Sequence, residues 1–386
     1  MEPRPCPIDR RRVSGGRGFG FLLLGIAVAA GFVPAAAGGV GPEIAGVRPG
    51  PGERAVALLE AGESFAGSSV GIRVVVVRGV HPGLVLCLTA AVHGDELNGV
   101  EVVRRTLGAV SPGELSGTLV AVPIVNVHGF QRNSRYLPDR RDLNRYFPGN
   151  PTGSSASRLA FTLFDRVIRN CDALVDLHTG SFHRTNLPQV RADLRNPAVR
   201  HLAEGFGGTI VLHSEGPPGT LRRAATEQGI PAITYEAGEP MRLQDEEIAR
   251  GVSGIRRLLG HLGMLQLAEA AAAPPELYYA SRWVRADHGG ILLTDVELGQ
   301  HVEIGDRLGT ITDPIVDEQH ELRAPYAGRV LGMAVQQVVI PGYAAFHIGL
   351  EGALPGPDDG PASLLFEEPA EEAYPGRPAE TDERPE

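Results

Sequence analysis

Short apolar, β-branched runs alternate with longer segments of helical character between residues 70 and 236, and this alternation constrains the fold more than any other feature. Strands that alternate with helices are typical of βαβ units, so the sequence predicts an α/β domain with a mixed, mainly parallel sheet. We expect strands at residues 72–77, 84–90, 119–125, 173–177, 209–212 and 232–235. We expect helices at residues 97–107, 155–169, 196–205 and 246–265. Ligands of such sheets gather at the carboxyl ends of the strands, so the residues that follow the strands are the candidates for a functional site.

The first 37 residues have the layout of a secretory signal peptide. Four arginines between residues 10 and 17 precede an apolar run at residues 19–33, and alanines at 35–37 provide small residues for cleavage. An uncleaved membrane anchor is the alternative, although the run is short for the roughly 20 residues that span a bilayer. The sequence therefore predicts export to the periplasm or the exterior, with membrane contact only if the signal is retained.

Three further parts follow the predicted catalytic domain at residues 45–268. A linker at 269–276 contains Pro274 and Pro275, and residues 277–352 contain short strands separated by glycine, which predicts a small all-β domain. Its glycine spacing is similar to that of the barrel-sandwich fold of biotinyl and lipoyl carrier domains. A carrier needs a lysine to hold its cofactor and the chain contains none, so we expect a lid or wall for the first domain. Residues 353–386 are rich in proline and acidic side chains and are predicted to be disordered.

The charge of the chain argues against a nucleic acid partner. The net charge is -10, and all 36 basic side chains are arginine. Nucleic acid binding needs a basic surface, which this composition does not offer.

Two cysteines remain once the predicted signal, which contains Cys6, is removed. Cys87 and Cys171 both lie beside apolar runs, and neither has the spacing of a metal motif. Because two cysteines of unknown separation in space do not establish a disulfide, we expect buried thiols.

Two predicted strands end in residues that bind metal ions. His93 and Glu96 follow the strand at 84–90, and His178 follows the strand at 173–177. A catalytic zinc commonly takes three protein ligands and one open position, and two histidines with one glutamate are among the common sets. By itself the His93 and Glu96 pair is equally compatible with a surface turn. Together with His178 at a second strand end, it predicts one zinc ion per chain.

Four linked motifs carry a resemblance to a known family. They are HGDE at residues 93–96, RY at 135–136 with DLNRYFPG at 142–149, DLHTG at 176–180 and YEAG at 235–238. Their order and approximate spacing resemble the succinylglutamate desuccinylase and aspartoacylase family over residues 55–265. The resemblance implies the fold of the zinc carboxypeptidases, and many bacterial members are similar to this chain in carrying a small β-rich domain after the catalytic one.

The resemblance implies roles in catalysis for four residues. His93, Glu96 and His178 match the zinc ligands of the family, and Glu236 matches its catalytic carboxylate. The chemistry independently requires such a group, because a carboxylate can accept a proton from the attacking water and pass it to the leaving nitrogen.

The resemblance also implies roles for arginines and an asparagine. Asn144 and Arg145 match the pair that binds the substrate carboxylate, which a guanidinium engages through both oxygens. Arg135 matches the arginine that polarises the scissile carbonyl. The chain is two residues longer here than the aspartoacylase pattern, so Arg140 and Arg141 are alternatives.

Two further residues are secondary candidates for the site. Arg222 or Arg223 is placed similarly to an arginine of the family that contacts the substrate carboxylate. Asp176, two residues before His178, is expected to orient that zinc ligand.

These residues predict a zinc-dependent amidohydrolase that uses activated water to cleave the amide bond of an N-acyl amino acid. An exported metallocarboxypeptidase acting on peptides or cell-wall fragments is the close alternative, because such material is present outside the membrane. A non-catalytic envelope binding protein is the third hypothesis. It predicts loss of metal ligands or of Glu236, and none is lost. The expected substrate is a small N-acyl amino acid or peptide that bears a carboxylate.

Overall fold

The computed structural model describes residues 41–63, 67, 69–267, 275–335 and 337–350. The predicted signal peptide at 1–37, the predicted tail at 353–386 and residues 269–274 of the predicted linker lie outside the described residues. In the described part of the chain, no helix combines the length and the apolar character needed to cross a membrane.

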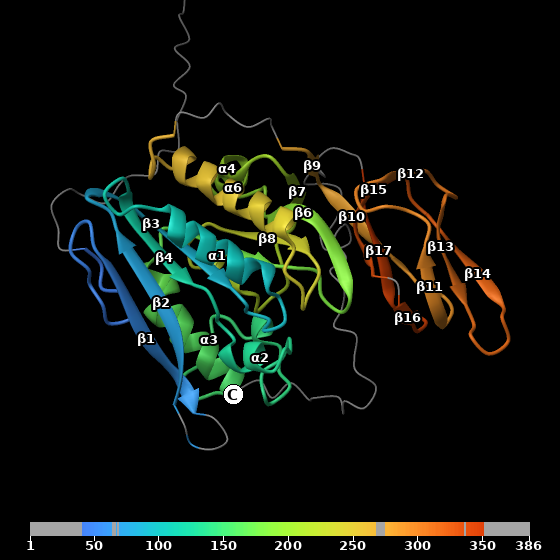
Figure 1. Cartoon of the computed structure of the whole chain (residues 1–386), viewed down its shortest axis with the longest axis horizontal. Helices are drawn as coiled ribbons and strands as arrows, with labels where there is room; N and C mark the ends of the chain where they lie inside the picture. The colour runs from blue at the N-terminus through green and yellow to red at the C-terminus, as the bar shows by residue number, and fades with distance from the viewer. Residues whose placement is uncertain (1–40, 64–66, 68, 268–274, 336, 351–386) are drawn as a thin grey trace, which may run out of the picture. The chain divides into compact units, whose positions relative to one another are not determined.

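A large mixed sheet contains the strands of the catalytic part (Figure 1). Its central pairs β4–β3, β3–β5 and β5–β8 are parallel, whereas β1–β2, β2–β4 and β8–β6 are antiparallel. The predicted α/β fold is confirmed. The strands are β1 (Arg54–Glu63), β2 (Ser69–Arg78), β3 (His81–Ala90), β4 (Ser116–Val122), β5 (Ala173–His178), β6 (Arg184–Ala192), β7 (Ile210–His213) and β8 (Ala232–Gly238).

Helices cover both faces of this sheet. Helices α1, α4 and α6 lie on one face (Figure 1), and their buried side chains belong to one core cluster. Buried side chains of α3 and α5 belong to the cluster on the other face. The helices are α1 (Asn98–Ala109), α2 (Val127–Gln131), α3 (Ser155–Arg166), α4 (Pro197–Phe206), α5 (Leu221–Glu227) and α6 (Asp245–His261), with 3-10 turns η1 (Leu143–Arg145) and η2 (Ile168–Asn170).

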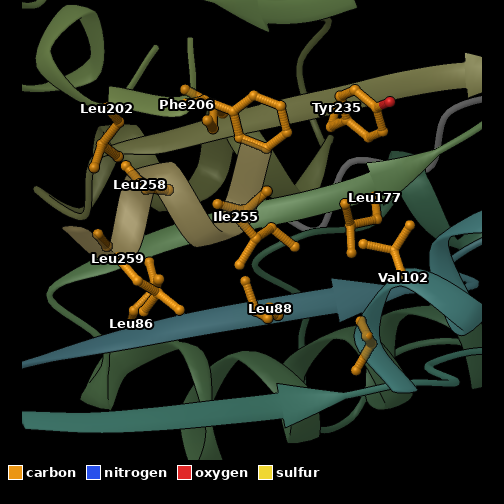
Figure 2. Close-up of a cluster of buried hydrophobic side chains, with 14 of the residues drawn as sticks. Leu86, Leu88, Val102, Leu177, Leu202, Phe206, Tyr235, Ile255, Leu258 and Leu259 are labelled. Atoms are coloured by element: carbon orange, nitrogen blue, oxygen red, sulfur yellow. The ribbon is translucent and has the colours of Figure 1, made fainter. Parts of the chain in front are cut away.

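The core explains why the central strands are almost wholly apolar. Figure 2 shows Leu86 and Leu88 of β3 facing Ile255 and Leu259 of α6, while Cys87, between them, belongs to the cluster on the opposite face. Successive side chains of a strand point to opposite faces, so a strand covered on both sides needs apolar residues at every position.

The C-terminal strands form a small antiparallel sheet and also extend the large one. The small sheet has the order β14-β13-β11-β16, whereas β15, β17 and β10 continue the large sheet because β15 pairs with β6. A small C-terminal β domain is therefore present. Its strands are β9 (Leu277–Tyr278), β10 (Ala280–Arg285), β11 (Gly290–Thr294), β12 (His301–Val302), β13 (Arg307–Thr312), β14 (Gln319–Arg323), β15 (Gly328–Ala334), β16 (Gln337–Val339) and β17 (Ala344–Leu350).

Strands β1 and β6 are absent from the sequence-based prediction. Strand β6 contains Pro188 and several polar residues, and its register against β8 shifts between Asn186 and Gln189. Proline is tolerated in a sheet at such irregularities, where a ladder hydrogen bond is already missing. A proline-containing polar segment therefore forms a strand here because β8 and β15 flank it.

The prediction that Cys87 and Cys171 are thiols is wrong. Their sulfurs form a disulfide, with Cα atoms 5.9 Å apart and a sequence separation of 84. Both residues are buried, at 1% and 6% exposure. The bond links β3 to the segment that enters β5, and the parallel pairing of these strands brings the cysteines together.

Candidate active site

The sheet brings the predicted metal ligands together from two neighbouring strands. His93 and Glu96 lie in the turn between β3 and α1, and His178 is the last residue of β5. Strands β3 and β5 are parallel, so their carboxyl ends lie at the same edge. The turn requires Gly94, since a Cβ atom there would lie 2.1 Å from the backbone of Gly129. The glycine of the HGDE motif is thus explained by close packing against α2.

The three side chains form a compact, buried group. The Nδ1 atoms of His93 and His178 lie 3.2 Å apart. One oxygen of Glu96 lies 2.8 Å from Nδ1 of His93, and the other lies 2.8 Å from Nδ1 of His178. Among the residues that the structure describes, this is the group of histidine, cysteine and acidic side chains arranged to hold a metal ion.

Two aspartates fix the orientation of the histidine rings. Nε2 of His178 lies 2.7 Å from Asp176, and Nε2 of His93 lies 3.2 Å from Asp142. With Nε2 held by a carboxylate, each histidine directs Nδ1 toward Glu96 and would offer that nitrogen to a metal ion. Asp176 lies where the sequence predicted it. Asp142 was missed, although it opens the DLNRYFPG motif.

The donor set fits a divalent cation. Burial disfavours charge on every member, yet Asp176 and Glu96 outweigh it and raise the pKa of His178. In the same way the two histidines hold the pKa of Glu96 well below its ordinary value despite burial. Two Nδ1 atoms 3.2 Å apart, each 2.8 Å from an oxygen of Glu96, form a donor set that suits a divalent cation.

Arg135 lies beside the metal ligands and is buried. Its Nη1 donates to Ser181 at 2.7 Å and to Glu96 at 3.2 Å, and its Nη2 donates to Asp142 at 2.8 Å. These carboxylates raise the pKa of Arg135 against the effect of burial, so the guanidinium stays charged. A fixed cation beside a metal site can stabilise negative charge on a carbonyl oxygen.

The alternatives to Arg135 do not reach the site. Arg141 pairs with Asp139 at 3.0 Å, and neither Arg140 nor Arg141 lines the pocket that contains the metal ligands. The loop between Arg135 and Asn144 therefore holds Arg140 and Arg141 outside the pocket, while Arg135 lies beside Glu96.

Glu236 lies on β8 directly opposite His178 in the register of β5 and β8. Its Oε2 accepts a hydrogen bond from Asn186 at 2.9 Å, and its Oε1 lies 3.8 Å from Nε of Arg191. Both partners come from β6, the strand that the sequence did not reveal. The carboxylate is thus held at the pocket wall by an amide and a cation.

Asn144 and Arg145 lie in η1, against the loop that precedes α5. Oδ1 of Asn144 accepts a hydrogen bond from the backbone of Leu221 at 2.8 Å, and Nη1 of Arg145 donates to the carbonyl of Asn144 at 2.8 Å. The buried guanidinium of Arg222 bonds Ser214, through its carbonyl and its hydroxyl. Helix α5 and η1 therefore hold three polar side chains on the same side of the site.

One pocket joins the predicted metal ligands, Glu236 and the predicted substrate-binding residues, whereas Arg223, the alternative to Arg222, does not line it. Its lining includes His93, Glu96, Arg135, Asn144, Arg145, His178, Arg222 and Glu236. It also includes Asn186, Arg191, Arg184 and Trp283, which were missed because they come from β6 and from the C-terminal strand β10. No local motif marks them, since tertiary pairing alone brings these strands to the pocket.

Comparison with known proteins finds a family that matches the catalytic part of the chain. The model of the succinylglutamate desuccinylase/aspartoacylase catalytic domain matches residues 82–262. The catalytic part of the chain belongs to this family. Among curated proteins, N-alpha-acetyl-L-2,4-diaminobutyric acid deacetylase of Halomonas elongata is 26% identical in an alignment of 251 residues, which covers 62% of this chain and 73% of the relative.

Solved structures of the family show the same fold. A succinylglutamate desuccinylase/aspartoacylase from Rhodobacter sphaeroides has a TM-score of 0.70 and 26% identity, covering 78% of this chain and 96% of its own. The product-bound ectoine utilization protein from Ruegeria pomeroyi has a TM-score of 0.71 and 25% identity, with coverages of 78% and 95%. The family comprises acyl amino acid deacylases, which are hydrolases of amide bonds.

Proposed function

We propose that this chain is a zinc-dependent hydrolase that cleaves the amide bond of a small N-acyl amino acid. The observation that carries the proposal is one pocket that combines the His93, Glu96 and His178 group with the carboxylate of Glu236 and the guanidinium of Arg145. Nitrogen and carboxylate donors with an open position suit zinc, which tolerates this low coordination number.

Each of these pocket residues has a separate role in the proposed reaction. When bound, the zinc ion supplies a Lewis acid that makes water reactive near neutral pH. Glu236 accepts the proton of the attacking water and returns it to the leaving nitrogen. Arg135 stabilises the negative charge that develops on the carbonyl oxygen. Arg145, with Asn144, binds the substrate carboxylate and so fixes the amide bond beside Glu236.

A panel of substrates tests this function. Release of free amine is measured from N-acetyl and N-succinyl amino acids and from peptides with free carboxyl ends, with and without a chelator. We expect chelator-sensitive hydrolysis of the N-acyl amino acids. Preferential release of amino acids from peptides would identify a carboxypeptidase instead, and no hydrolysis of either class by the zinc-loaded protein would reject the enzymatic proposal.

Export of the protein is also proposed. Two independent features support it: the arginine-rich, then apolar, beginning of the sequence, and the disulfide between Cys87 and Cys171. Disulfides persist in the periplasm and the exterior, where no reducing thiol pool acts on them.

Removal of metal ligands is expected to abolish metal binding. The wild-type protein should contain one zinc per chain by elemental analysis, and the His93→Ala/His178→Ala variant should contain almost none, because a single carboxylate does not hold the ion.

Asp176→Asn should keep the site but weaken zinc affinity by about 10- to 100-fold, the usual effect of removing the carboxylate that orients a histidine ligand. His201→Ala is the control. Nδ1 of His201 lies 3.1 Å from Nε2 of His261, and His201 does not line the pocket. Equal zinc content in all variants would contradict the assignment.

Arg145→Ala is expected to act mainly on substrate binding. Loss of a hydrogen bond to a charged group should raise KM by at least about tenfold for substrates with a free carboxylate. The same substrates with an amidated carboxylate should show little change. Arg141→Ala is the matched control, because this neighbouring arginine pairs with Asp139 and does not line the pocket. An equal rise in KM for free and amidated substrates would show that Arg145 does not contact the carboxylate.

A further inference from the structure

Asn186 of β6 lies between the carboxylate of Glu236 and the C-terminal strands. It lines the pocket and is 4% exposed. Its Nδ2 donates to Oε2 of Glu236 at 2.9 Å. An ionised carboxylate accepts hydrogen bonds and donates none, so the nitrogen of the amide must face Glu236 and its oxygen must face elsewhere. The orientation of this amide therefore matters for the place of the carboxylate.

An extra residue in β6 brings Asn186 to the same face of the sheet as Glu236. In the register of β6 and β8, Gln189 is opposite Glu236 and Asn186 is opposite Gly238, so three steps along β6 match two along β8. Side chains alternate between the faces of a regular strand, so Leu187 would share the face of Glu236 if the extra residue were absent. Bulges next to active sites commonly redirect a side chain in this way.

Gly332 of β15 leaves the space that the amide oxygen of Asn186 occupies. The two residues are partners in the register of β15 and β6. A Cβ atom at position 332 would lie 2.7 Å from Oδ1 of Asn186, closer than Cβ atoms approach other heavy atoms. The next nearest atoms, on His347 and Thr185, would lie 3.5 Å away, which is ordinary contact. A side chain at position 332 would therefore displace the amide and little else.

The C-terminal strands also fix the backbone of β6 beside Asn186. Thr185 pairs with Met333, and Arg184 pairs with Ala334. The buried guanidinium of Arg184 donates through Nε to the carbonyl of Ala344 on β17 at 2.6 Å. Strand β6 is thus held between β8 of the catalytic part and β15 of the C-terminal domain.

We propose that Asn186 is a positioning residue for Glu236, and that Gly332 of the C-terminal domain sets the orientation of its amide. The proposal rests on the proposed function, in which Glu236 moves the proton. Asn186 engages one oxygen of the carboxylate and so directs the other to the attacking water. Because a misplacement of about 1 Å can lower a rate by about a hundredfold, we expect the effect of this contact on kcat.

The amide signals of Asn186 in a nuclear magnetic resonance spectrum report on the contact without catalysis. Protein labelled with ¹⁵N-asparagine shows the side-chain amides, and those of Asn186 are identified by their absence from Asn186→Ala. We expect these signals to shift in Glu236→Gln, where the charged acceptor is lost, and in Gly332→Ala, where the amide is displaced. Unchanged signals in both variants would overturn the proposal.

Kinetics of Asn186→Ala and Gly332→Ala test the positioning role. Asn186→Ala should lower kcat at least about tenfold, with KM and zinc content nearly unchanged, because the variant loses a hydrogen bond to a charged group. Gly332→Ala should lower kcat by a similar factor. Its urea midpoint should change little, because the displaced group is the end of a side chain. A fall in kcat that occurs only together with loss of zinc would make Asn186 merely structural and reject the proposal.

The double variant Asn186→Ala/Gly332→Ala tests whether the two residues act through one contact. We expect it to have the kcat of Asn186→Ala alone, since the added methyl group has no amide left to displace. Falls in kcat that multiply would show that Gly332 acts elsewhere. Gly289→Ala is the control, because its Cβ atom would meet its nearest neighbour at 3.5 Å and Gly289 does not line the pocket. It should leave kcat and the amide signals unchanged.

The two proposals fail separately. If the parent enzyme hydrolyses the N-acyl amino acids and Asn186→Ala keeps the parental kcat, the positioning role is rejected and the hydrolase stands. If the zinc-loaded parent hydrolyses nothing, the hydrolase is rejected, and the amide signals of Asn186 decide whether Gly332 sets its contact with Glu236.

Discussion

Glu236→Gln is expected to lower kcat by about a hundredfold or more while zinc remains bound, because the variant loses the group that moves the proton. The substitution is nearly isosteric, and the new side chain still offers an oxygen to Asn186, which donates to Glu236 at 2.9 Å. The metal ligands lie on β5 and in the turn after β3, so their hydrogen bonds are unchanged. Steady-state kinetics and elemental analysis of the same sample check both parts.

A neighbouring carboxylate provides the control for Glu236. Glu239 follows three residues later, pairs with Arg242 at 2.7 Å and does not line the pocket. Glu239→Gln should therefore leave kcat unchanged. A Glu236→Gln enzyme with wild-type kcat would remove Glu236 from the catalytic role, and one that had lost its zinc would make it part of the metal site.

Loss of the disulfide is expected to produce the largest change in stability. The bond closes a loop across a sequence separation of 84, and in the chain-entropy account a loop of this length stabilises the folded state by about 4.5 kcal/mol. Unfolding by urea of a Cys87→Ala/Cys171→Ala variant should show this decrease in the free energy of unfolding. The wild-type protein under a reducing agent should show a similar decrease, and the variant should not respond to the reductant.

Counting thiols provides a direct check of the disulfide and bears on export. In a Cys6→Ser background, the denatured, unreduced protein should contain no alkylatable thiol when recovered from an oxidising compartment. The same chain made in a reducing cytoplasm should contain two and should be less stable. Two free thiols in protein recovered from the periplasm would contradict both the bond and the structural argument for export.

The Cys87–Cys171 bond illustrates what a linear sequence does not contain. Each cysteine lies in an apolar context that fits a buried thiol equally well. Whether two sulfurs meet depends on the register of β3 against β5, and pairing of distant strands is a property of the folded chain.

The central strands and the metal group, by contrast, follow from local patterns. Apolar, β-branched runs predict strands because each strand of a doubly covered sheet buries both faces. Each of the six predicted runs overlaps an observed strand, although the predicted 119–125 extends three residues beyond β4 and the predicted 209–212 begins one residue before β7. His93, Glu96 and His178 follow two of these runs directly. Their convergence needs only that β3 and β5 be parallel neighbours, which a βαβ pattern predicts.

The sequence by itself thus determined the α/β class, the ends of the strands that carry the site and the residue types of the predicted metal group. Tertiary structure decided which arginine lies beside Glu96, since Arg135, Arg140 and Arg141 differ only in how their loop folds. It also decided that β6 and β10 bring Arg184 and Trp283 to the pocket. The physical reason is the range of the interactions: side-chain periodicity acts over a few residues, whereas loop packing and the pairing of distant strands depend on the whole chain.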